Sequence, residues 1–137
     1  MLLYLFTDVF ILFGSIGLYW FQQEEIGLAG TLAFPLMMGG NLLLIGRDVA
    51  IFSASLYPFG ALMYAAGLDS LAVGSWQAKK FSRWIPILWI LSTIVGPIGY
   101  FAGGLSVLFV VSGVLFGFGF AQAGITVLFS GVTLDHS

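Results

Sequence analysis

The sequence is poor in the residues that carry most protein chemistry: its 137 residues include no cysteine, one histidine, four basic and six acidic residues. Without cysteine the chain forms no disulfide and offers no thiolate to a nucleophilic, zinc or iron–sulfur site. The histidine, His136, lies beyond the apolar segments, so no imidazole is predicted for a metal or haem site between them. Four basic residues are too few for a patch that binds nucleic acid. We therefore predict no metal ligand and no nucleic-acid partner, and the residues identify no cofactor.

The remaining polar groups form no recognisable catalytic set. The sequence has no HExxH motif, no paired catalytic carboxylates and no Ser/His/Asp arrangement. Serines within the apolar segments, such as Ser92 and Ser112, have no base in the chain that could activate them. We therefore predict that this polypeptide is not catalytic on its own, although it could belong to an enzyme complex.

Charge is missing altogether from residues 84–134, which contain no Asp, Glu, Lys or Arg. A single helix of that length would be about 76 Å long, whereas the hydrocarbon core of a bilayer is about 30 Å thick. The segment therefore has to cross a membrane, turn and cross back. The whole chain agrees, because it is 60% hydrophobic and 7% charged with a mean hydropathy of +1.08. These features predict an all-α integral membrane protein.

Charged residues and glycine pairs divide the chain into apolar segments of about 20 residues, as transmembrane helices require. Barrel strands would instead alternate apolar and polar residues over about ten residues. The reversal within the charge-free segment is predicted at Gly103-Gly104, because paired glycines accept tight turns. We expect a compact bundle of about five transmembrane helices, with four plus a re-entrant segment as the alternative. The predicted spans are 2–21, 26–45, 49–68, 85–102 and 105–130, and residues 69–84 form an interfacial loop.

The basic residues predict the orientation. Lys79, Lys80 and Arg83 lie in the 69–84 loop, so the loop is assigned to the cytoplasmic side by the positive-inside rule. The span count then places the C-terminus on the same side and the N-terminus on the opposite side. Trp76 and Trp84 flank these cations, and all five residues are predicted to anchor the loop at the membrane interface.

Five residues are candidates for an ion or substrate pathway, and four of them are polar. Asp8 lies about 24 Å from Glu24 along a helix, which favours an acid near the membrane surface over a proton- or cation-binding group. Arg47 and Asp48 are expected in the short turn between the second and third spans. The alternative is a pair drawn below the surface, with Asn41 pointing into the bundle.

The fifth candidate is Pro97, which lies inside the fourth predicted span. Proline removes one helical hydrogen bond and frees a carbonyl, and broken helices hold ions or substrates in transporters. A simple kink is the alternative, because transmembrane helices tolerate proline.

Small residues mark a helix-packing face on the last span. Gly113, Gly117 and Ala121 recur at every fourth position, and Gly124 lies close to the same face. This spacing lets two helix backbones approach closely, and the partner helix could belong to this chain or to another.

Three functions are compatible with these observations. The scarcity of chemical groups favours an accessory or assembly subunit of a larger membrane complex, in contact with lipid and with other transmembrane helices. The alternative is a small homo-oligomeric channel or transporter that uses broken helices and the few polar groups. The second alternative is a membrane protein that binds a lipid, a quinone or a pigment.

Overall fold

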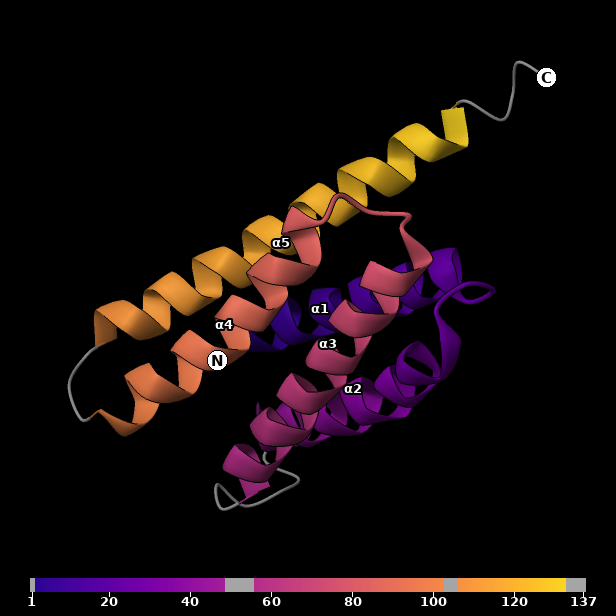
Figure 1. The fold of residues 1–137 in the computed structure, drawn as a ribbon. Helices are drawn as coiled ribbons and strands as arrows, with labels where there is room; N and C mark the ends of the chain where they lie inside the picture. Colours follow the sequence, from indigo (N-terminus) through magenta and orange to yellow (C-terminus); the bar gives the residue numbers. More distant parts are fainter. Residues whose placement is uncertain (1, 49–55, 103–105, 133–137) are drawn as a thin grey trace.

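A computed structural model describes residues 2–48, 56–102 and 106–132, and this part of the chain folds into five α-helices without a strand (Figure 1). In chain order the helices are α1 (Leu2–Gln22), α2 (Gly27–Asp48), α3 (Tyr57–Ala78), α4 (Trp84–Phe101) and α5 (Ser106–Val132). The predicted all-α bundle is confirmed.

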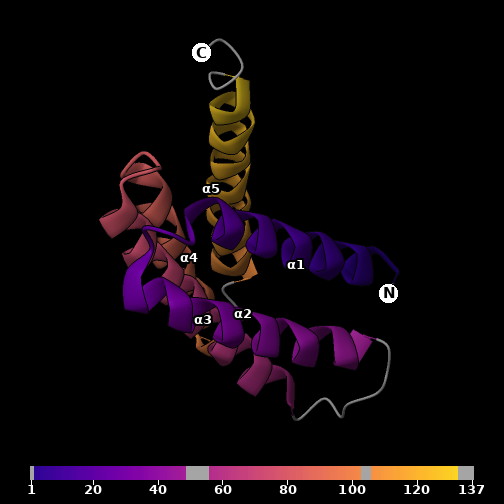
Figure 2. The same cartoon turned by 90° about the vertical axis from the view of Figure 1, so that its right-hand side faces the viewer.

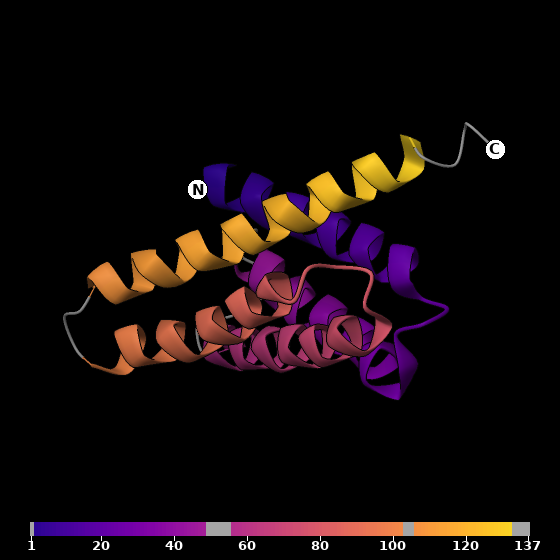
Figure 3. The ribbon, with the colours of Figure 1, turned by 45° about the horizontal axis from the view of Figure 1, so that its top comes forward.

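Each helix runs roughly antiparallel to the one before it, so the bundle has two distinct ends (Figures 1 and 3). The connectors 22–26 and 79–83 lie at one end, which we call the charged end because it carries Glu24, Glu25, Lys79, Lys80 and Arg83. The first residues of α1, α3 and α5 lie at the opposite end. The last turns of α5 extend past the other helices (Figure 2).

Four helical segments are long and apolar enough to cross a membrane: Leu2–Gln22, Gly27–Gly46, Trp84–Phe101 and Val107–Ser130. The chain is therefore a multi-pass membrane protein. The other helix, α3, has the length of a crossing at 22 residues, and it packs between α2 and α4. That α3 is a fifth crossing stays a prediction.

The third helix differs most from the predicted boundaries. Residues 69–78, expected in an interfacial loop, continue α3, and the helix ends where Lys79 adopts a left-handed conformation with φ of 56°. Asp69 is tolerated in the helix because its Oδ1 accepts a hydrogen bond of 2.7 Å from Thr93 Oγ1 of α4. The loop is thus reduced to residues 79–83. The predicted start of the third span, 49–55, and the predicted turn at 103–104 lie outside the described residues.

Glycine brings α2 and α3 into close contact. A Cβ on Gly40 would lie 2.5 Å from the backbone nitrogen of Tyr64 and 2.7 Å from the carbonyl oxygen of Gly60. Further along, a Cβ on Gly74 would lie 3.1 Å from Cα of Gly30. Small residues allow such backbone approach in membrane helices, so α2 and α3 form a tight hairpin.

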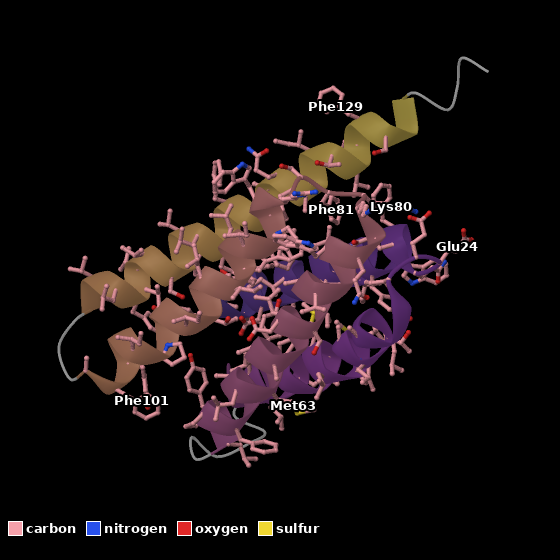
Figure 4. The ribbon with its side chains drawn as sticks, viewed as in Figure 1. Glu24, Met63, Lys80, Phe81, Phe101 and Phe129 are labelled. Atoms are coloured by element: carbon pink, nitrogen blue, oxygen red, sulfur yellow. The ribbon has the colours of Figure 1, made fainter. Side chains whose placement is uncertain are left out.

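Buried apolar side chains gather in the half of the bundle next to the charged end. Trp89 of α4 is fully buried at the centre of this core, and Phe81 and Ile85 pack beside it. Figure 4 shows Lys80 and Phe81 at this end and Phe101 at the opposite one. The remaining members of the core are Leu18, Ile26, Ala33, Met37, Leu68, Leu71, Ala72 and Ala123.

Candidate ligand-binding cleft

The half of the bundle away from the charged end contains a cleft of about 310 Å³. All five helices contribute to its walls, with Asp8 from α1, Asn41 from α2, Tyr64 from α3, Thr93 from α4 and Phe116 from α5. Because successive helices reverse direction, the start of α1, α3 and α5 meets the end of α2 and α4 here. The cleft has a volume within the range of small-molecule sites.

Apolar and aromatic side chains form most of the lining. Leu44, Ala61, Leu62, Ala65 and Leu68 contribute aliphatic surface. Six rings also line the cleft, those of Tyr57, Tyr64, Tyr100, Phe101, Phe109 and Phe116. Such walls suit the apolar body of a ligand, with a few polar groups left to orient it.

The cleft ends against a row of packed rings that continues toward the charged end. Its first pair, Tyr64 and Phe116, meets edge to face with centroids 6.1 Å apart. Successive rings along the row have centroids 4.6 to 6.4 Å apart. The row comprises Tyr64, Phe116, Phe120, Trp89, Phe81 and Phe21.

Asn41 is the most deeply buried polar side chain of the cleft, with 1% of its surface exposed. Its Nδ2 donates a hydrogen bond of 3.4 Å to the backbone carbonyl of Asp8. Its Oδ1 has no hydrogen-bond partner in the described part of the chain. Buried acceptors are nearly always paired in folded proteins, so this enclosed, unpaired oxygen on a cleft-lining residue is an exception.

Three other hydroxyl groups around the cleft are already paired. Tyr64 and Ser15 share a hydrogen bond of 3.3 Å between their hydroxyl oxygens, and Ser112 Oγ donates to the carbonyl of Ser92 at 2.8 Å. Thr93 Oγ1 donates to Asp69, as described above. The amide oxygen of Asn41 therefore differs from these three hydroxyl groups in having no hydrogen-bond partner among the described residues.

The structure brings three of the predicted pathway residues, Asp8, Asn41 and Pro97, to this one cleft. Asp8 is half-buried there, and Pro97 leaves the carbonyl of Thr93 without the amide donor that another residue would supply. Arg47 and Asp48 are the last residues of α2 rather than a turn, and their side chains lie outside the described set.

The predicted packing face of α5 is not covered by another helix among the described residues. A Cβ built on Gly113, Gly117 or Gly124 would meet no atom within 4 Å, and Ala121 is exposed. A neighbouring face of α5 packs against the bundle instead. On that face, a Cβ on Gly119 would lie 2.7 Å from Nε1 of Trp89.

The glycines that pack tightly were missed by sequence reasoning. In α3 they are Gly60, Gly67 and Gly74, all buried against α2. Their spacing of seven residues is the signal that could have identified them, because such positions return to the same face of a helix.

The predicted interface anchors lie at the charged end, but Lys80 has a different role from the others. Its Nζ donates to the carbonyl of Phe21 at 3.2 Å, lies 3.6 Å from Glu25 Oε1 and sits 5.3 Å from the centroid of the Phe21 ring. Lys80 therefore links the connector 79–83 to the end of α1 and the connector 22–26. Trp76, Lys79, Arg83 and Trp84 are exposed and available to the membrane interface.

Comparison of the chain with models of known protein families, with curated proteins and with solved structures finds no match. Within the described ranges there is no group of three or more His, Cys, Asp or Glu side chains placed to hold a metal ion.

Proposed function

We propose that the protein binds a small, largely apolar molecule in the cleft between its five helices, within the membrane. The observation that carries this proposal is the convergence of all five helices on one aromatic-lined cleft, to which Asp8 and Asn41, with its unpaired amide oxygen, also contribute. This function is the lipid-, quinone- or pigment-binding alternative from the sequence. Transport is less favoured, because the packed ring row fills the bundle between the cleft and the charged end.

Two glycines on α5 with open space around a built Cβ allow the proposal to be tested. Gly113 lines the cleft, whereas Gly117 lies one turn further on and does not. Neither position has an atom within 4 Å of a built Cβ. In Gly113→Phe the added ring can enter the cleft, and in Gly117→Phe the same ring lies outside it.

The measurement is the amount of small molecule extracted with each purified variant from native membranes and identified by mass spectrometry. We expect wild type and Gly117→Phe to retain the same bound compound, and Gly113→Phe to lose most of it. Equal retention by both variants, or no compound with wild type, would count against binding in the cleft.

A second candidate is the accessory or assembly subunit of a larger membrane complex, which the sequence favoured. Its support is the uncovered small-residue face of α5, together with the exposed side chains of Leu128 and Phe129. Figure 4 shows Phe129 on the turns of α5 that extend past the bundle. Here Gly117→Phe is the informative variant. We expect it to reduce crosslinking to any partner polypeptide in native membranes, and unchanged crosslinking would contradict this role.

The proposed orientation places the charged end on the cytoplasmic side. Its support is the gathering of Lys79, Lys80 and Arg83 at that end of the bundle, where the positive-inside rule expects basic residues. Glu24 and Glu25 share the end, but acidic residues contribute little to this rule.

A further inference from the structure

Asn41 lines the cleft with a paired amide nitrogen and an unpaired amide oxygen. Its amide nitrogen is held by the carbonyl of Asp8, which fixes the orientation of the side chain. The amide oxygen of this cleft-lining residue is enclosed and has no donor among the described groups. In an apolar site, an unpaired acceptor favours any molecule that supplies the missing donor.

The neighbouring side chains do not supply that donor. The hydroxyl groups of Ser112 and Thr93 are donated to the carbonyl of Ser92 and to Asp69, and Tyr64 pairs with Ser15. The other described buried side-chain atoms without a partner belong to Gln22, Ser75 and Trp89, which do not line the cleft. Asn41 Oδ1 is thus the one buried side-chain atom of the cleft that lacks a hydrogen-bond partner among the described residues. The rest of the lining is mainly aromatic and aliphatic, with Asp8 as its charged member.

We infer that the cleft selects apolar molecules that carry a hydroxyl or N–H donor, and that Asn41 Oδ1 accepts a hydrogen bond from this donor. The inference rests on the proposed binding function and specifies its ligand class: an alcohol, a phenol or an amine on a hydrocarbon skeleton. An ether or ester on the same skeleton would leave Oδ1 unpaired. Sites built around a hydrogen bond reject analogues that lack the partner group more strongly than apolar contacts alone can do.

The test compares farnesol, farnesylamine and farnesyl methyl ether, which share one skeleton. Binding is measured to the purified protein in lipid nanodiscs, and partition into empty nanodiscs is subtracted. We expect farnesol and farnesylamine to bind about tenfold more tightly than the methyl ether, as for the loss of one buried hydrogen bond. Farnesylamine is a cation at neutral pH, so tighter binding of the amine than of the alcohol would report the Asp8 carboxylate of the cleft, and the comparison of farnesol with its ether reports Asn41.

The variant Asn41→Leu removes the acceptor and should reduce the ratio between farnesol and its ether to about one. Gln22→Leu is the matched control, because Gln22 is also a fully buried amide whose Oε1 lacks a partner, and it lies at the charged end. We expect this control to keep the wild-type ratio. If Asn41→Leu does not fold, the comparison of the three probes on wild type still decides the inference.

The two proposals fail in different ways. Equal binding of farnesol and its methyl ether to wild type overturns the role of Asn41 and leaves binding in the cleft intact. An unchanged ratio in folded Asn41→Leu also overturns that role. Absence of binding by all three probes overturns the proposed function itself.

Discussion

Replacing Gly40 with alanine tests the packing that positions the cleft. The new Cβ would lie 2.5 Å and 2.7 Å from backbone atoms of α3, which cannot rotate away as a flexible side chain would. The two helices would have to move apart. Overpacking of this kind costs about 1–3 kcal/mol, whereas alanine gains about 0.5–1 kcal/mol over glycine within a helix.

The matched control is Gly17→Ala, because a Cβ on Gly17 meets no atom within 4 Å and only the helical gain applies. We therefore expect Gly40→Ala to be less stable than Gly17→Ala by about 1–3 kcal/mol. The assay is reversible unfolding in mixed detergent micelles with increasing dodecyl sulfate, followed by far-ultraviolet circular dichroism. Because Asn41 adjoins Gly40, we also expect weaker ligand binding in Gly40→Ala. Equal stability of the two variants would refute the close approach of α2 and α3.

Further predictions concern polar contacts between elements and the topology. Thr93→Val removes the donor to Asp69 and should lower the free energy of unfolding by about 1–3 kcal/mol, whereas Thr126→Val, which loses only a bond to its own helix at the Gln122 carbonyl, should change it far less in the same unfolding assay. Lys80→Met should lower the free energy of unfolding by about 1–3 kcal/mol, because it removes a charge-assisted hydrogen bond to the Phe21 carbonyl as well as a weak ion pair with Glu25, and an unchanged stability would mean that Lys80 does not hold the two connectors together. Since the chain has no cysteine, single cysteines at Leu56 and Ser82 can be labelled with impermeant maleimide in oriented vesicles; we expect labelling from opposite sides, and labelling from one side would mean that α3 does not cross.

The boundaries of α1, α2, α4 and α5 were predicted to within a few residues, because charged residues flank the first two spans and Gly103-Gly104 divides the charge-free segment. Charge is not a strict limit, since α2 includes Arg47 and Asp48. Reasoning from charge also ended the third span at Asp69, although the helix continues to Ala78. The stabilising partner of Asp69 is Thr93, which is distant in sequence. Contacts of that kind decide whether a polar residue ends a helix or lies within it, and they are invisible in local composition.

Three pathway residues of the candidate site were predicted individually, but the sequence did not show that they line one cleft. Asp8, Asn41 and Pro97 were each singled out for their chemistry, and the alternation of helix direction brings them to one end of the bundle. Of the small-residue face of α5, Gly113 lines the cleft and the rest is not covered by another helix among the described residues. The sequence pattern identifies a face and not its partner. The aromatic lining was also beyond prediction, because rings that face lipid and rings that face a cleft have the same composition.

The most direct test of the central claim is mass spectrometry of the intact wild-type protein released from nanodiscs prepared with native lipids. Binding in the cleft predicts a population whose mass exceeds that of the polypeptide by one small molecule per chain, released as a single compound on activation. A spectrum that contains only the mass of the polypeptide would contradict the proposed function.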